Sequence, residues 1–332
     1  MSKLFSLFIL SSLFYSCQKQ VEIQIPKSPP KLVVNCLFTQ DSIFKVQLAS
    51  SSYIFDTTYR YIDNATVNLF ANNILIEKLN YKGKGKYETA TYTPNTHIKY
   101  RIEISAEGYE TVFASSELPP KVQINNINAN IYSQETDNNE LYSNIQIEFS
   151  DPDEIKNFYE LLIPYNYEEY NIIQNPDLCF EPDELINDTI CKHTSSGFAH
   201  IYSNSPVFST IFTSRKKTIF ENYIPAVFSD NLFNGENYTV NVDFLDGSYN
   251  LPDTAKFNIL LNSISEDFFK YLSVKSINQN TSGNEFLDEL WDGWQIDEPI
   301  QMYSNVKNGY GIFAGYNLSI DSIFYIKALN KK

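Results

Sequence analysis

Few residues in this chain have types and spacing suited to chemistry, and the best group is a pair of cysteines with two nearby histidines. Cys179, Cys191, His193 and His200 supply the thiol and imidazole groups that a structural zinc ion uses. The two cysteines also bracket a polar loop of about a dozen residues, and closing such a loop gains on the order of 3 kcal/mol in the chain-entropy model. Outside the cytoplasm, pairing is favoured over metal binding. The sequence therefore predicts a Cys179–Cys191 disulfide, and neither a metal site nor a cofactor.

A second group, in the run SDPDEI, offers carboxylates that could bind Ca²⁺. Its members are Asp151, Asp153 and Glu154. Calcium takes six to eight oxygen ligands, so three neighbouring carboxylates need several more from elsewhere in the chain. A solvated turn before Phe158 is the favoured interpretation.

Catalytic motifs are absent from the sequence. The histidines are His97, His193 and His200, and neither G-x-S-x-G nor H-E-x-x-H occurs. Residues 83–86 lack the spacing and the Ser or Thr of a phosphate-binding loop, and they predict a basic hairpin turn. Paired carboxylates could cleave glycosides, but that mechanism needs a defined separation in space. We therefore assign no catalytic residue and expect a protein that is not an enzyme.

Two segments near the C-terminus have residue types suited to binding. Trp291 and Trp294 lie in an acidic run, where two indoles could form a platform for a sugar or a protein; a loop folded onto the core is the alternative. In NVKNGYGIF, residues 305–313, Asn308 and Gly309 accept a positive φ and Gly311 allows a close backbone approach, which predicts a fold-defining hairpin. A binding role for this turn is the second interpretation. The candidate contact residues are thus Trp291, Trp294, Asn305, Asn308, Gly309 and Tyr310.

The N-terminal residues, MSKLFSLFILSSLFYSCQK, have the pattern of a lipoprotein signal peptide. Lys3 provides the positive charge, residues 4–15 form an apolar run, and the small Ser16 precedes Cys17. The run is shorter than the roughly 20 apolar residues that span a bilayer. We therefore predict that residues 1–16 are removed and that Cys17 carries acyl chains that anchor the protein. An ordinary secretory signal with an incidental cysteine is the alternative, and the sequence leaves the face of the membrane open.

The composition limits the classes of partner. The 332 residues have a formal net charge of −15, and 43% are hydrophobic and 15% aromatic. Such a chain can bury a core in each of two domains. The acidic balance argues against nucleic acid, whose binding requires clustered Lys and Arg. It also argues against docking of a basic patch on anionic lipid.

Strand patterns dominate the chain after a proline-bearing tether at residues 17–30. Apolar residues recur with period two, as in Phe44, Val46 and Leu48, and turn signals punctuate these runs. The pattern predicts a mainly β protein with a small Ig-like sandwich at residues 31–118, ended by Pro119 and Pro120. Residues 119–332 predict a larger β-rich domain.

Two further features concern single positions in these domains. Ser263 and Glu266 have the spacing of a capping box, which predicts one helix near residues 263–277 that closes one side or end of the second sheet system. Cys36 lies in the apolar run LVVNCLF, and a buried free thiol is its expected state.

Several stretches together resemble the lipoprotein family called domain of unknown function 4249, which occurs in Gram-negative bacteria. The resemblance covers nearly the whole mature chain, and its most specific piece is EPIQMYSNVKNGYGIFAGYN, residues 298–317. Cys36 departs from the pattern because a glycine is common there, and residues 287–297 look like an insertion. The other stretches are KLVVNCLFTQDSIFKVQLASSSYIFD (31–56), ATVNLF (65–70), GKYET (85–89), YRIEISAEGY (100–109), FSDPDEIKNFYELLI (149–163) and FSDNLFNGENY (228–238).

The resemblance implies an outer-membrane lipoprotein of unassigned activity, found beside TonB-dependent receptors, and it supplies no catalytic residue. The first domain also resembles regulatory, transthyretin-like sandwiches, which is a likeness of fold alone. We therefore expect a lipid-anchored protein of the outer membrane that is a non-enzymatic accessory or ligand-capturing partner of a TonB-dependent receptor, with a glycan or peptide as its ligand. The alternatives are a glycan-binding module that uses exposed aromatics and, third, an uncharacterised hydrolase.

Overall fold

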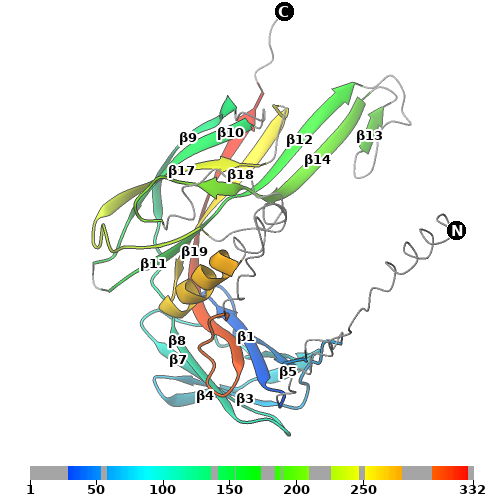
Figure 1. The fold of residues 1–332 in the computed structure, drawn as a ribbon, viewed down its shortest axis with the longest axis vertical. Helices are drawn as coiled ribbons and strands as arrows, with labels where there is room; N and C mark the ends of the chain where they lie inside the picture. Colours follow the sequence, from blue (N-terminus) through cyan, green and yellow to red (C-terminus); the bar gives the residue numbers. More distant parts are fainter. Residues whose placement is uncertain are drawn as a thin grey trace, which may run out of the picture.

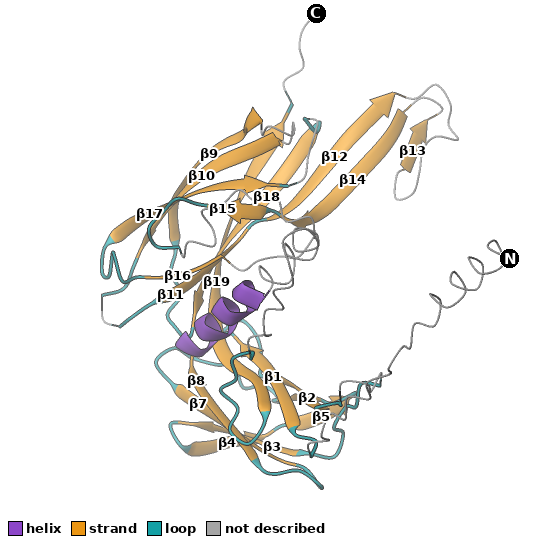
Figure 2. Ribbon diagram, in the orientation of Figure 1, coloured by secondary structure: helices purple, strands orange, loops and turns teal. Residues whose placement is uncertain are grey.

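The computed structural model describes residues 29–53, 58–135, 141–153, 155–172, 184–187, 190–208, 226–246, 251–278 and 301–327. These residues are mainly β-strand, and their one helix, residues 266–278, lies between two sandwich-like bodies (Figures 1 and 2). The mainly β fold with a single helix in the C-terminal half is as the sequence predicts. In this part of the chain, no helix has the length and apolar character needed to cross a lipid bilayer.

The first sandwich forms because its strands alternate between apolar and polar residues. Tyr100, Ile102 and Ile104 are buried on one face of a strand, and Val46 and Leu48 meet them from the other sheet in the same core. One layer has the order β4-β3-β7-β8, and the other contains β1, β2, β6 and β5 in that order. The bounds are β1 (Leu32–Phe38), β2 (Lys45–Ser50), β3 (Thr66–Ala71), β4 (Ile74–Lys78), β5 (Asn80–Gly83), β6 (Lys86–Glu88), β7 (Lys99–Ser105) and β8 (Val112–Glu117).

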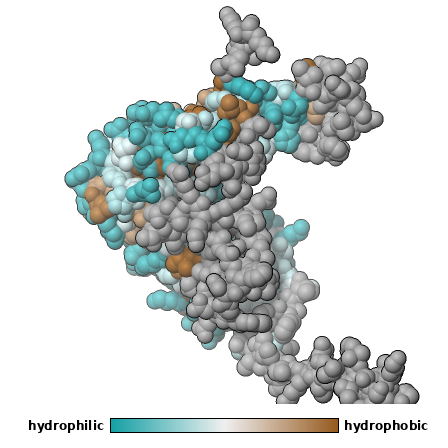
Figure 3. Space-filling view, turned by 45° about the horizontal axis from the view of Figure 1, so that its top comes forward, coloured by the Kyte–Doolittle hydropathy of each residue, from teal (hydrophilic) through white to brown (hydrophobic). Residues whose placement is uncertain are grey.

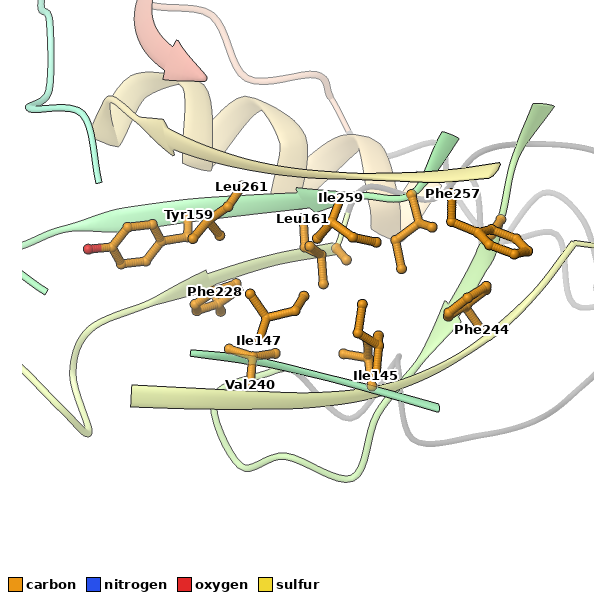
Figure 4. Packing of buried hydrophobic residues seen from close by; sticks show 14 of the residues in the cluster. Ile145, Ile147, Tyr159, Leu161, Phe228, Val240, Phe244, Phe257, Ile259 and Leu261 are labelled. Carbon is orange, nitrogen blue, oxygen red and sulfur yellow. The ribbon is translucent and has the colours of Figure 1, made fainter. Parts of the chain in front are cut away.

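The second sandwich packs two sheets around a larger core. Figure 4 shows Ile145, Ile147 and Val240 pointing from one sheet toward Leu161 and Ile259 on the other. The first sheet has the order β15-β17-β10-β9, and the second contains β13-β14-β12-β18, with β11 pairing both β18 and β16. The bounds are β9 (Ile124–Glu135), β10 (Leu141–Ser150), β11 (Phe158–Leu162), β12 (Pro164–Ile172), β13 (Glu184–Asn187), β14 (Ile190–Phe198), β15 (His200–Tyr202), β16 (Ala226–Ser229), β17 (Asn237–Leu245) and β18 (Thr254–Ile264).

One long strand, β19 (Tyr310–Ile326), belongs to both sandwiches. Its residues 310–315 pair with β1 in parallel, and its residues 316–326 pair with β18 in antiparallel register. Phe313 packs in the core of the first sandwich, with its ring centroid 4.9 Å from that of Phe38. The expected boundary after residue 118 therefore leaves out a strand of the first sandwich, because parallel pairing with β1 depends on a partner nearly 300 residues away in sequence.

The cap of the helix lies two residues after the expected one. Ser263 lies within β18, whereas the Ser265 hydroxyl accepts from the Phe268 N–H at 3.4 Å and the Ser265 carbonyl accepts from the Phe269 N–H at 2.9 Å. Ser265 is thus the N-cap, and the predicted Ser263–Glu266 box is wrong. The strand extends through Ile264 because this residue is buried against the helix.

The helix lies on the outer face of the second sandwich's larger sheet, next to the junction. Its Phe268 and Leu272 pack against Phe158 of β11 and against Ile312 and Ala314 of β19. The helix therefore covers strands of both sandwiches, rather than closing the second sheet system alone.

Candidate functional site

A cleft of about 710 Å³ lies where the two sandwiches meet. Its lining comes from the ends of β7 and β8, the link after β8, the residues before β11, the first turn of the helix, and residues 304–307. Ligand sites favour such junctions and have volumes of roughly 300–1,000 Å³. The titratable side chains of the lining are His97, Lys99, Glu117, Lys156, Glu266, Asp267 and Lys307.

Asn305 forms one wall by taking the place of a strand partner. Its Nδ2 donates to the Phe313 carbonyl at 2.8 Å, and its Oδ1 accepts from the Phe313 N–H at 3.0 Å. The same Nδ2 lies 3.3 Å from the Ser115 carbonyl of β8. Two residues later, Lys307 bridges to Phe113, also of β8. The segment is therefore fixed between β8 and β19.

A buried asparagine fixes the link between the sandwiches. Asn317 of β19 has an exposed fraction of 0%, and its Nδ2 donates to the Pro119 carbonyl at 2.6 Å. Its Oδ1 accepts from the Thr39 hydroxyl at 3.3 Å and from the Gln40 N–H at 3.4 Å. Because Pro119 lines the cleft, this amide sets the position of the cleft wall against β19.

The helix side of the cleft carries carboxylates that already have partners. Glu266 forms an ion pair with Lys270 at 2.9 Å, one turn along the helix. Asp267 accepts from the Tyr303 hydroxyl at 2.6 Å. Burial and this bond to Asp267 raise the pKa of Tyr303, so the phenol stays a donor. The two acidic groups thus fix the first helical turn.

The wall in front of β11 depends on two buried aspartates. The Asp230 carboxylate, which is 1% exposed, accepts from the Asn157 N–H at 2.6 Å, and the Asn157 side chain donates to the carbonyls of Pro152 and Ile155, each at 2.8 Å. These bonds connect Pro152, Ile155 and Asn157, and with them the neighbouring Lys156, to the turn after β16.

Asp151 is the second of these aspartates, and it lies in the predicted solvated turn. It is only 7% exposed, accepts from the Tyr159 hydroxyl, and also accepts from the Gly235 N–H at 2.9 Å. Burial raises its pKa, and the neighbouring Asp230 adds to this rise. The solvated turn is therefore wrong for this residue, because its carboxylate serves as a buried acceptor. Glu154, the third carboxylate considered for calcium, lies outside the described residues.

The cleft is lined by lysines that are available to bind an anionic ligand. Lys99, Lys156 and Lys307 line it, and none of the ion pairs between described residues includes them. Lys156 lies over the Phe158 ring, 5.3 Å from its centroid. Glu266 is offset by Lys270 and Asp267 is directed at the Tyr303 hydroxyl, which leaves Glu117 as the anionic side chain of the lining without such a partner among the described residues. The cleft is thus suited to a polar ligand that carries negative charge.

The structure separates the contact residues proposed from sequence. Asn305 lines the cleft, whereas Tyr310 lies at the other end of the first sandwich, paired with Val33. Asn308 has the expected positive φ of 64°, and its Nδ2 donates to the Thr111 carbonyl at 3.1 Å. Gly309 lacks a positive φ and instead allows close approach, because a Cβ there would lie 2.6 Å from the Leu32 carbonyl oxygen. The segment runs beside β8 at Lys307 and turns back at Asn308 into β19, so that Asn305 lies opposite Phe313.

The close backbone approach expected at Gly311 is confirmed. Its φ is +110°, and a Cβ there would lie 2.0 Å from the Val34 carbonyl oxygen of β1. Trp291 and Trp294 lie outside the described residues, as does Cys17.

The cysteine and histidine group is only partly placed. Cys191 is buried in β14 and Cys179 lies outside the described residues, so their disulfide stays a prediction. His193 and His200 belong to strands of different sheets. Among the described residues, no three His, Cys, Asp or Glu side chains gather closely enough to hold a metal ion. Cys36 is free and buried, as predicted.

Sequence reasoning missed most of the cleft. Lys156, Ser265 and Asn317 become neighbours of the cleft only through long-range pairing, and Pro119 was seen as a strand stop rather than as a wall. The available signal for Lys156 and Asn317 was their position inside the stretches that resemble a known family.

Comparison with known proteins identifies the family of this chain. The family model described as a domain of unknown function (DUF4249) matches residues 18–319, which include both sandwiches, the helix and every described residue of the cleft lining. No curated protein matches the chain. The chain therefore belongs to the DUF4249 family.

Proposed function

We propose that this protein is a lipid-anchored, non-enzymatic component of the cell envelope that captures an anionic polar ligand in the cleft between its sandwiches. The single observation that carries the proposal is the cleft itself, a space of about 710 Å³ bordered by three lysines. Its volume suits a short peptide or oligosaccharide. Glu266 and Asp267 beside it are used for an ion pair and a hydrogen bond, which supports a binding role.

The walls of the cleft are arranged for binding without a large rearrangement. Asn305, Asn317 and Ser265 fix its different sides through side-chain hydrogen bonds to the backbone. Preorganised walls lose little conformational freedom on binding, which favours affinity.

The cellular setting in this proposal is the outer membrane. Acyl chains on Cys17 would hold the protein there, and a TonB-dependent receptor would accept the captured ligand. The support is the signal-like N-terminus and the membership of the family. Mass spectrometry of native material tests the acylation, and a pull-down from native membranes should recover a β-barrel receptor. Non-reducing peptide mapping tests the Cys179–Cys191 bond.

Ligand capture is tested with two anionic probes, oligoglutamate and oligogalacturonate. The double variant K156E/K307E should bind at least tenfold more weakly to whichever probe the unaltered protein binds, which corresponds to about 1.4 kcal/mol. The matched control, K256E/K327E, makes the same change at two lysines that are exposed on the second sandwich away from the cleft. It should change binding less than twofold. If neither probe binds the unaltered protein, or if both double variants behave alike, the cleft is not the ligand site.

A further inference from the structure

The two ends of the first sandwich have different surroundings. Because β1 runs parallel to β19, and β19 continues into the second sandwich, the start of β1 lies at the end remote from that sandwich, toward the bottom of Figure 1. The chain enters the first sandwich here, at Lys31. We call this end the tether end and define it by Lys31, Tyr59, Arg60, Tyr61, Lys84 and Tyr310.

Backbone contacts place these residues on one continuous surface. The Lys31 carbonyl accepts from the Ser51 N–H at 2.8 Å, and the Arg60 carbonyl accepts from the Ser50 N–H at 2.9 Å. Tyr61 bridges to Ala49. The Lys84 carbonyl accepts from the Gln47 side chain at 2.7 Å, which brings the β5–β6 turn alongside β2. Tyr310 lies under Lys31, with the ammonium 5.4 Å from the ring centroid.

The aromatic and cationic side chains of this surface are turned toward solvent. Tyr59, Tyr61 and Tyr310 have exposed fractions of 59%, 45% and 43%. Lys31, Arg60 and Lys84 are also exposed, and no ion pair between described residues includes them. Exposed tyrosines beside cations are the combination that lipid headgroups accommodate, because the ring is amphipathic and the cations attract anionic lipid.

The acidic groups nearby reduce this charge without cancelling it. Asp63 accepts from the Gly85 N–H at 2.7 Å and is therefore committed to the turn. Glu107 and Glu110 lie in the turn between β7 and β8, which also points toward this end. Lys82 and Lys86 flank the β5–β6 turn and are exposed.

The charge of the whole chain is distributed unevenly in a way that suits this orientation. Residues 31–118 contain nine Lys and Arg against nine Asp and Glu, whereas residues 119–332 contain thirteen against thirty. The negative charge that argued against docking on anionic lipid thus belongs to the second sandwich and its loops. Figure 3 shows that the visible face of the described residues is mostly hydrophilic, with small, separate apolar spots.

The segment that precedes the first sandwich sets how far this end can lie from a membrane. Eleven residues, 18–28, lie between Cys17 and the first described residue, Pro29. A coil of that length spans about 20 Å on average and at most about 40 Å when extended. An acylated Cys17 therefore holds the tether end, and not the cleft, next to the bilayer.

We infer that the tether end rests on an anionic phospholipid surface, so that the second sandwich and the cleft face away from the membrane. The inference rests on the proposed lipid anchor for the choice of membrane, but the surface contact does not need the acyl chains. Its tyrosines would lie at headgroup level, and its lysines and arginine would contact lipid phosphates.

The test uses the mature chain from residue 17 with Cys17→Ser, so that no acyl chain contributes. Sedimentation with vesicles of phosphatidylethanolamine and phosphatidylglycerol is compared with vesicles of phosphatidylcholine. Each cation near such a surface is worth about fivefold in partitioning, so K31Q/K84Q should lower binding to the anionic vesicles about 25-fold. The matched control, K256Q/K327Q, removes the same charge from the second sandwich and should change binding less than twofold.

Two results would overturn the inference. One is equal binding of the unaltered chain to anionic and zwitterionic vesicles, and the other is an equal loss in the two double variants. Both pairs lie on the surface, so thermal unfolding of each variant shows whether it remains folded. Acylation is measured separately on native protein, so an unmodified Cys17 would refute the anchor without affecting the vesicle result.

Discussion

Replacing Gly311 with Ala should strongly destabilise the protein, because the backbone of β1 leaves no room for a side chain at this position of β19. A Cβ at this position would lie 2.0 Å from the Val34 carbonyl oxygen, and the backbone has a φ of +110°. The positive φ alone costs a residue with a side chain roughly 1–2 kcal/mol. Relieving the contact also requires β1 to move away from β19, and losing two backbone hydrogen bonds costs about 2 kcal/mol more. We expect a total loss of about 3–4 kcal/mol in the free energy of unfolding.

Gly83 provides the matched control for this experiment. Its φ is +100°, but a Cβ there would have no atom within 4 Å. Gly83→Ala should therefore cost only the conformational part, about 1–2 kcal/mol. Urea unfolding followed by far-ultraviolet circular dichroism gives both values. If the two variants unfold within about 0.5 kcal/mol of each other, close packing of β1 against β19 does not stabilise the fold as we argue.

Three further outcomes follow from buried polar groups. Burial raises the pKa of Cys36, so its thiol should resist alkylation at pH 8 in the folded protein and react once urea unfolds it, as mass spectrometry would show; rapid labelling of the native state would contradict this. Asn317→Ala should lower the free energy of unfolding by about 2–4 kcal/mol because it removes the donor to the Pro119 carbonyl; a loss below 1 kcal/mol in urea would be inconsistent with that role. Since the pKa of Asp151 is raised above its unfolded value of 3.8, its ionisation opposes folding, and this cost grows as the pH rises from about 4 through the folded pKa. The stability of the unaltered protein relative to D151N should therefore fall over that range in urea titrations, and a flat difference would exclude the effect.

Local patterns were sufficient to predict the class of fold. Alternation in segments such as Tyr100 to Ile104 reflects burial on one face of a strand, which neighbouring residues determine by themselves. The same locality explains why Cys36 was placed correctly. A period of two says nothing about which strand lies alongside, and the parallel partner of β1 comes from the other end of the chain.

The cleft was beyond prediction for the same reason. Its walls meet because Asn317 bonds to Pro119 and Asn305 bonds to Ser115, and each pair is separated by nearly 200 residues. Gly309 was assigned a turn geometry from its type, but glycine also serves where a neighbouring backbone comes close, and only the fold distinguishes the two uses. Ser263 and Ser265 both suit a cap, and the burial of Ile264 in the strand decides between them.

The placement of β19 has a consequence for biosynthesis. Synthesis delivers the chain from its amino end, so most of the first sandwich emerges long before residues 310–315, which complete its sheet beside β1. Until then β1 has a free edge, which is prone to pairing with other chains. Maturation must therefore wait for the arrival of the carboxyl end, and a nascent molecule cut short before that point would expose an incomplete sheet in each half.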